Sequence, residues 1–228
     1  MKFFIPIATA VLLITAIAGC KKSYTIGGST FVAQVNVTTY DYLKTNHKFD
    51  TLVLMIDKMG MKDEINQAGT FFAVTNYSIR NFILAREADH QIIYNNENLH
   101  YTFDSLDFNQ LKDTLRTYLF ADRITRDNIS QIGLWRASKE GDYRWIQMQA
   151  TNDYTNQSIF TTNPKYMYLT KIIAKNGFPV PTDSTQLGQV DPSQLLTTLC
   201  QTTGILTTTG VLHVLNDLHT FNYYGDTN

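Results

Sequence analysis

His213 is the histidine best placed for catalysis in this 228-residue chain, because it lies inside an apolar segment near the C-terminus. A nucleophilic enzyme needs a serine or cysteine close to a histidine and a carboxylate, usually at a glycine-flanked turn, and no Gly-X-Ser-X-Gly segment is present. We therefore predict that His213 is a buried, hydrogen-bonded core residue and not a base. The carboxylate pairs Asp63-Glu64 and Glu87/Asp89 stand in polar segments, and we expect them to be solvated.

Metal and phosphate ligands also lack the required spacing. A zinc site needs clustered Cys, His or carboxylate residues, and no such cluster occurs in the sequence. Cys200 is the only cysteine besides Cys20, and we predict that it is a small buried hydrophobic residue. No glycine-rich segment precedes a helix as a phosphate-binding loop would. We expect no catalytic residues, no cofactor and no metal, and we interpret the chain as non-enzymatic.

Cys20 is the residue with the clearest expected modification. Lys2 precedes an almost uninterrupted apolar run that ends in Ala18 and Gly19, directly before the cysteine. A short basic region, an apolar region and small residues before a cleavage site are typical of a secretory signal peptide. Small residues before a cysteine indicate a bacterial lipoprotein, whose acylated cysteine is the first residue of the mature chain. An uncleaved anchor is disfavoured because the run is short for a membrane span.

The chain divides into three expected parts. Residues 1–19 are predicted to be the lipoprotein signal peptide, residues 20–34 a lipidated tether, and residues 35–228 a single domain, because no Pro/Gly/Ser-rich linker divides them. The 19 basic and 20 acidic residues nearly cancel and form no blocks. This balance argues against a nucleic-acid partner, and it leaves the lipid on Cys20 as the expected membrane contact.

An aromatic strand face is the candidate binding surface. Residues 134–138 and 143–150 are predicted strands around a turn at residues 139–142. Alternation places Tyr143 and Trp145 on one face of the second strand and Ile146 on the other, core-facing side. With a four-residue turn, Trp135 joins the core and Arg136 lies beside Trp145 as a cation–π partner. Tyr143, Trp145 and Arg136 are therefore candidate ligand contacts, although plain packing of the aromatic rings is the simpler interpretation.

Short helices and a buried strand are expected to organise the domain. The spacing predicts helices over residues 40–46, 49–59 and 61–67, with Thr39 as one N-cap and Gly60 as a C-terminal stop. Residues 71–74 form a continuous apolar run behind Gly69 that predicts a buried strand, and Thr75 or Asn76 is the expected cap of a following helix. A further helix is predicted from Phe108 to about Leu119, capped by Asp107. Strands are predicted at residues 159–163, 167–173, 204–206 and 210–215, and a strand or helical turn at residues 195–199. Residues 176–194 are expected to form a loop, and the tail from Tyr223 is expected to fray.

The segment Thr70-Phe71-Phe72-Ala-Val-Thr-Asn76 resembles the first signature of fasciclin-like domains, a Thr-Val-Phe-Ala-Pro-Thr-Asn type segment. The segment Thr209-Gly210-Val-Leu-His213-Val-Leu215 is similar to the second, Asn-Gly-Val-X-His-X-Ile/Leu. The resemblance implies an α+β fasciclin-like fold, a β-sandwich or wedge of short strands with several flanking α-helices. It also implies that the two segments lie side by side and that their shared residues are structural.

Four departures from the family limit what the resemblance implies. Val74 replaces the family's proline, and Thr209 replaces its usual asparagine. Leu119 stands where the family's Tyr-His segment has the histidine, so a role of that histidine does not carry over. The Asp-Ile pair that animal relatives use for receptor binding is Gly204-Ile205 here, so that function does not carry over either.

Two function hypotheses remain. The first is a lipid-anchored interaction module of the adhesion type, which binds an envelope protein or a polysaccharide. The second is a carbohydrate-binding lipoprotein of a glycan uptake system, with Tyr143 and Trp145 as a stacking platform. Both place the protein outside the cytoplasm, in the bacterial cell envelope, with the outer membrane (periplasmic or surface face) as the expected membrane.

Overall fold

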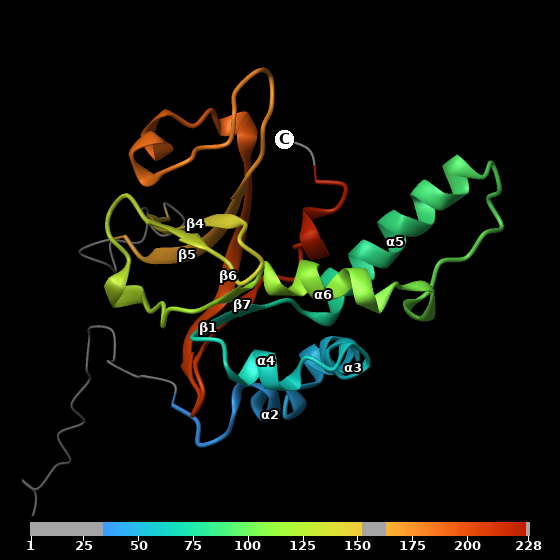
Figure 1. The fold of residues 1–228 in the computed structure, drawn as a ribbon, viewed down its shortest axis with the longest axis horizontal. Coiled ribbons are helices and arrows are strands. Elements are labelled where there is room, and N and C mark those ends of the chain that lie inside the picture. Colours follow the sequence, from blue (N-terminus) through green and yellow to red (C-terminus); the bar gives the residue numbers. More distant parts are fainter. Residues whose placement is uncertain (1–33, 152–162, 227–228) are drawn as a thin grey trace, which may run out of the picture. The chain divides into compact units, whose positions relative to one another are not determined.

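The structure, a computed structural model, describes residues 34–151 and 163–226. The expected signal peptide, Cys20 and nearly all of the expected tether lie outside these residues, as does almost all of the strand predicted at residues 159–163. The described residues all belong to one compact unit. Its described part contains α-helices and a seven-stranded sheet, which confirms the predicted α+β class (Figure 1).

The described helices and strands follow one another in mixed order. The α-helices are α2 (Thr39–Lys44), α3 (Asp50–Met59), α4 (Lys62–Asn66), α5 (Asn76–Ile93) and α6 (Phe108–Arg116). The strands are β1 (Thr70–Ala73), β2 (Leu119–Phe120), β3 (Leu134–Ala137), β4 (Tyr143–Ala150), β5 (Lys165–Ile172), β6 (Leu195–Leu206) and β7 (Val211–Leu215). Short 3₁₀ turns include η5 (Ser184–Gln189), η6 (Pro192–Gln194) and η7 (Phe221–Tyr223). No helix of the described part is long and apolar enough to cross a bilayer.

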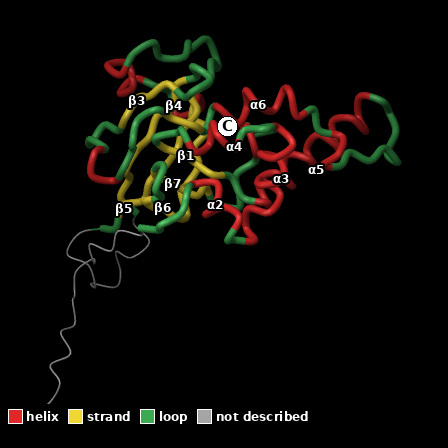
Figure 2. Tube along the Cα trace, turned by 60° about the horizontal axis from the view of Figure 1, so that its bottom comes forward, coloured by secondary structure: helices red, strands yellow, loops and turns green. Residues whose placement is uncertain are grey.

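The two segments that resemble the family signatures lie side by side. The strand order is β2-β1-β7-β6-β5-β4-β3, and β1 pairs with β7 in parallel while its other neighbour, β2, is antiparallel. The register sets Phe71 opposite Leu212 and Phe72 opposite His213. The prediction that these distant segments are adjacent in one folded unit is therefore confirmed (Figures 1 and 2).

The sheet is nearly closed. The Lys139 N–H, just after β3, donates to the carbonyl of Leu119 in β2 at 2.7 Å. Arg136 Nε also donates to Asp122 Oδ2 at 3.0 Å. These contacts join the two strands that stand at opposite ends of the strand order.

The hairpin between β3 and β4 differs from its predicted register by one residue. The Ser138 N–H donates to the Asp142 carbonyl at 2.8 Å, so the loop has three residues, not the predicted four. Gly141 supplies the left-handed position that such a loop needs, at φ +97°. A one-residue change moves every side chain of one strand to the other face. The predictions that Trp135 joins the core beside Ile146's face and that Arg136 lies beside Trp145 are therefore wrong. Trp135 lies opposite Trp145, and Arg136 lies opposite Arg144.

Two of the four predicted helix caps form as expected, whereas Thr75 occupies the N-cap position of α5 without a side-chain hydrogen bond to the helix backbone. Asp107 Oδ1 accepts from the N–H groups of Asn109 and Gln110 at 3.0 and 3.3 Å, and Gly60 ends α3 at φ +67°. The predicted Thr39 cap is wrong by one residue, because Thr38 Oγ1 accepts from the Asp41 N–H. The predicted extension of α6 to Leu119 is also wrong, because Leu119 pairs with Phe71 in the sheet.

The C-terminal third is more regular than predicted. Residues 195–199 and 204–206 belong to one strand, β6, with irregular pairing near Thr202. The loop predicted over residues 176–194 is confirmed, since it holds only 3₁₀ turns. The prediction of a frayed tail is wrong for its first residue, because Tyr223 is buried and its hydroxyl donates to the Leu169 carbonyl at 2.9 Å.

Two apolar clusters pack on the sheet. The main core joins the helices to β1, β2, β7 and the inner faces of β4, β5 and β6, and it includes Ile146 as predicted. A smaller cluster of Trp135, Ile172 and Leu187 lies apart from it. The hairpin register places Trp135 in this smaller cluster and not in the main core.

Candidate functional site

The residues that resemble the first family signature hold neighbouring segments in place. Thr70 Oγ1 donates to the Asp122 carbonyl at 2.6 Å and accepts from the Ile124 N–H at 2.7 Å. Asn76 Oδ1 accepts from the Thr51 N–H at 2.8 Å, and its Nδ2 donates to the His47 carbonyl at 2.6 Å. Thr70 and Asn76 therefore have structural work in this fold. Phe71 and Phe72 are fully buried.

The second segment is equally enclosed. A Cβ on Gly210 would lie 2.6 Å from the Ala68 carbonyl oxygen, so only glycine fits there without movement of the backbone. Thr209 Oγ1 accepts from the Thr39 N–H at 3.0 Å, so this departure from the family pattern anchors the start of α2.

His213 has both ring nitrogens engaged inside the core. Nδ1 accepts from the Gly204 N–H at 3.1 Å, and Nε2 therefore carries the proton and donates to the Ile124 carbonyl at 2.9 Å. Its ring stacks on Phe72 with centroids 4.8 Å apart. Burial lowers the pKa of His213 from 6.5 to about 4, so the imidazole is neutral near pH 7. The prediction of a buried, hydrogen-bonded core histidine is confirmed.

A second buried histidine, His219, was not singled out in the sequence. Its Nε2 lies 2.8 Å from the Tyr118 hydroxyl and its Nδ1 lies 3.0 Å from Thr198 Oγ1. Burial lowers the pKa of His219 to about 3. Cys200 is buried and free as predicted, and burial raises the pKa of its thiol.

The three predicted ligand contacts are divided between two faces of the sheet. Tyr143 and Trp145 share one face, where Tyr143 is 48% exposed and stacks on Trp135 with ring centroids 5.2 Å apart. Trp145 is half-buried, and its Nε1 donates to the Ile132 carbonyl at 2.7 Å. Arg136 lies on the opposite face and pairs with Asp122. The predicted joint site of these three residues is therefore not formed.

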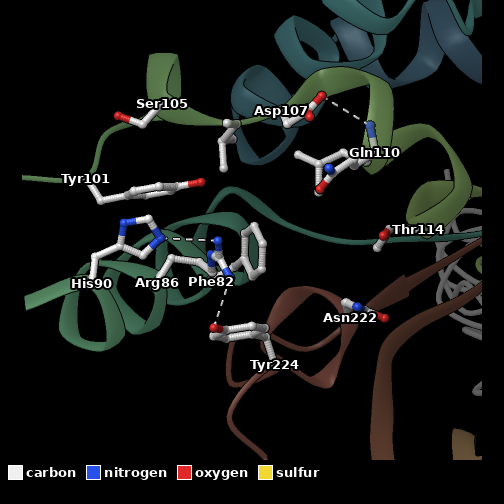
Figure 3. Close-up of a pocket in the computed structure, with 12 residues that line it drawn as sticks. Phe82, Arg86, His90, Tyr101, Ser105, Asp107, Gln110, Thr114, Asn222 and Tyr224 are labelled. Carbon is white, nitrogen blue, oxygen red and sulfur yellow. Dashed lines mark hydrogen bonds between the residues drawn. The ribbon is translucent and has the colours of Figure 1, made fainter. Parts of the chain in front are cut away.

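A groove that sequence analysis did not predict lies between α5, α6 and the C-terminal segment (Figure 3). Its volume is about 420 Å³, within the range of small-molecule sites, roughly 300–1,000 Å³. Its aromatic and polar lining includes Arg86, Tyr101, Asp107, Gln110, Asn222 and Tyr224.

Arg86 is the positive centre of the groove. Its Nη1 donates to the Tyr224 hydroxyl at 3.1 Å, and its Nη2 lies 3.2 Å from His90 Nε2. The guanidinium carbon lies 5.3 Å from the ring centre of Tyr224 and 5.7 Å from that of Tyr101. The hydrogen bond to Tyr224 raises the pKa of Arg86, so the side chain stays charged. Tyr224 in turn donates to the carboxylate of Asp89.

The opposite wall supplies acceptors and amides. Asp107 Oδ1 accepts hydrogen bonds from the backbone at the start of α6, and both Asp107 and Gln110 are exposed to solvent. Figure 3 shows the Gln110 and Asp107 side chains across the groove from Arg86 and Tyr101, with Asn222 at its lower edge. One cation and one carboxylate thus face each other among neutral donors, acceptors and aromatic rings. Such a lining suits a hydroxyl-rich ligand without a large net charge.

The sequence matches no family model and no curated protein. Among the described residues, no group of three or more His, Cys, Asp or Glu side chains is arranged to hold a metal ion.

The groove escaped sequence analysis because its walls are far apart in the chain. Arg86, Gln110 and Tyr224 belong to three separate elements. The one available signal was the Tyr223-Tyr224 pair, whose aromatic rings are unusual in a segment expected to fray.

Proposed function

We propose that this chain is a lipid-anchored, non-enzymatic interaction module of a bacterial cell envelope, built on a fasciclin-like domain. Its partner is an envelope protein or a polysaccharide. The observation that carries the proposal is the open groove around Arg86, which combines aromatic rings with side chains able to donate and accept hydrogen bonds. Of the two partner classes, this lining favours the polysaccharide.

The fasciclin-like part of the proposal is supported by the β1–β7 pairing. Two segments about 140 residues apart, each resembling one family signature, are adjacent strands with Phe72 opposite His213. The shared residues also have structural tasks: Thr70 and Asn76 bond to segments beside these strands, and Gly210 allows close approach to the Ala68 carbonyl.

The non-enzymatic part is supported by the state of the two buried histidines. His213 and His219 each place both ring nitrogens against partners of the fold, and burial keeps both rings neutral near pH 7. Neither ring can act as a base without breaking core contacts.

The anchoring part rests on sequence alone. Ala18 and Gly19 before Cys20, after one lysine and an apolar run, are the pattern of a lipoprotein signal. Acyl chains on Cys20 hold the domain at the membrane, because more than one chain gives stable attachment.

Binding of envelope polysaccharide by the purified full chain tests the proposal. We expect Gln110→Ala to weaken binding about tenfold, because a hydrogen-bonding amide leaves the groove. Asn109→Ala is the matched control, since Asn109 is exposed on the same helix but does not line the groove. Retained binding by Gln110→Ala, or equal losses in both variants, contradicts the assignment of the groove.

A second candidate function is a carbohydrate-binding lipoprotein of a glycan uptake system, with the ligand on Tyr143 and Trp145. The observation that favours it is the half-exposed ring of Tyr143, stacked on Trp135. Glycan-array binding that disappears in Trp145→Ala at unchanged thermal stability, and survives in Gln110→Ala, supports this candidate over the groove.

A further inference from the structure

Three basic side chains form a row across neighbouring strands. The β3–β4 register sets Arg136 opposite Arg144. The β4–β5 register sets Trp145 opposite Thr170, so the next residues toward that end of the strands are Arg144 and Lys171. Like charges directly opposite one another destabilise a sheet unless other charges offset them.

Only the first of these charges is well compensated. Arg136 is paired with Asp122 at 3.0 Å. Arg144 is 2% exposed, and its nearest carboxylate, Asp142, lies 3.7 Å from Nη2 and is itself largely in solvent. Its Nη1 donates only to the carbonyl of the adjacent Tyr143.

Arg144 Nε is a buried donor with no partner among the described residues. A buried, incompletely satisfied guanidinium is costly, and native structures seldom leave one without a partner. Lys171 is half-buried and takes part in none of the ion pairs formed within residues 34–151 and 163–226. Burial and the nearby Arg144 lower the pKa of Lys171.

A second orphaned polar atom belongs to the same strand face. Ser138 lies two positions beyond Arg136 and pairs through its backbone with Asp142. Alternation therefore puts Ser138, Arg136 and Arg144 on one side of the hairpin. Ser138 Oγ is buried and has no partner among the described residues.

We propose that this end of the β3–β4–β5 face binds a small oxyanion, a phosphate, sulfate or carboxylate group, between Arg144, Lys171 and Ser138. Guanidinium, ammonium and hydroxyl donors are the groups that recognise such oxygens, and charge-assisted hydrogen bonds are the stronger kind. Among the described residues, Arg144 and Lys171 bring two positive charges against the single paired carboxylate of Asp142, so a bound anion relieves the repulsion between them. The site is separate from the Arg86 groove and does not depend on the proposed function.

Thermal unfolding of the full chain in detergent tests the site. Sodium phosphate, sulfate or acetate replaces sodium chloride at constant ionic strength. We expect the Tm of the wild-type chain to rise with the logarithm of oxyanion concentration, as for a ligand that binds only the folded state. Lys171→Met should weaken oxyanion binding and raise the apparent Kd at least tenfold. Lys165→Met, an exposed lysine of the same strand, is the matched control and should respond like wild type.

The comparison of variants separates binding from general salt effects, because phosphate and sulfate stabilise folded proteins by exclusion from their surface. A response to phosphate and sulfate alone assigns a tetrahedral oxyanion, and a response to acetate alone assigns a carboxylate; either supports the site. Equal responses of wild type and Lys171→Met to every anion overturn it.

A direct measurement covers the case in which Lys171→Met does not fold. The Nε–H resonance of Arg144 in the wild-type chain should shift on addition of the anion that raises Tm, while that of Arg116, which is already paired with Glu64, stays in place. A stationary Arg144 resonance at saturating oxyanion overturns the proposal.

Discussion

At the scale of single residues, the buried histidines tie stability to pH. The pKa of His213 falls from 6.5 to about 4 on folding, so below pH 6.5 the unfolded chain binds a proton that the folded chain excludes. The contribution of His213 to the free energy of unfolding is therefore fully present above pH 6.5 and is lost as the pH falls toward 4. His219 acts in the same direction, with a pKa lowered to about 3.

The corresponding prediction concerns His213→Gln. Urea unfolding at a series of pH values between 4 and 6.5 should show a slope against pH that is smaller than in wild type by about one proton, or about 1.4 kcal/mol per pH unit. Leu218→Gln is the control, because Leu218 is 85% exposed and carries no titratable group, so the slope should stay as in wild type. Parallel slopes for wild type and His213→Gln would show that His213 is not a buried neutral group.

At the scale of elements, glycines decide how closely strands approach. Gly210→Ala should cost about 2 kcal/mol or more in the free energy of unfolding, because its Cβ meets the Ala68 carbonyl oxygen at 2.6 Å. Gly188→Ala is the control, since no atom lies within 4 Å of its Cβ position. Chemical denaturation measures both, and equal stability of the two variants would rule out the close contact at β7.

The hairpin loop makes a separate prediction. Gly141 has φ +97° with open space around its Cβ position, so a substitution there adds backbone strain without a clash. Gly141→Val should destabilise by roughly 1–2 kcal/mol, and Gly141→Asn by less, because asparagine tolerates positive φ. Equal losses measured by urea unfolding would contradict the left-handed loop position.

Elements also show where sequence reasoning succeeded and failed. The strand at residues 71–74 and the caps at Gly60 and Asp107 were predictable because apolar runs and cap chemistry are local. The face of the sheet on which Trp135 lies was not predictable, because a hairpin loop shorter by one residue moves the side chain to the opposite face. The Arg86 groove was not predictable either, since its walls meet only through tertiary packing of α5, α6 and the tail.

At the scale of the whole molecule, the proposed membrane attachment depends on Cys20, one of the two cysteines. Metabolic labelling with a clickable fatty acid should mark the wild-type protein and recover it in the membrane fraction. Cys20→Ser should abolish both, because no other acylation site is expected at the N-terminus. Cys200→Ser is the matched control and should remain labelled, since Cys200 is buried in the folded domain. Labelling that survives in Cys20→Ser would refute the lipoprotein assignment.

The central claim is that a partner in the envelope occupies the groove around Arg86. A photo-crosslinking amino acid at position 110, in the full chain expressed in its native host, tests this proposal. We expect an adduct with envelope polysaccharide or with one envelope protein at position 110, and none at position 109 on the same helix. No adduct at either position, or the same adducts at both, would contradict it.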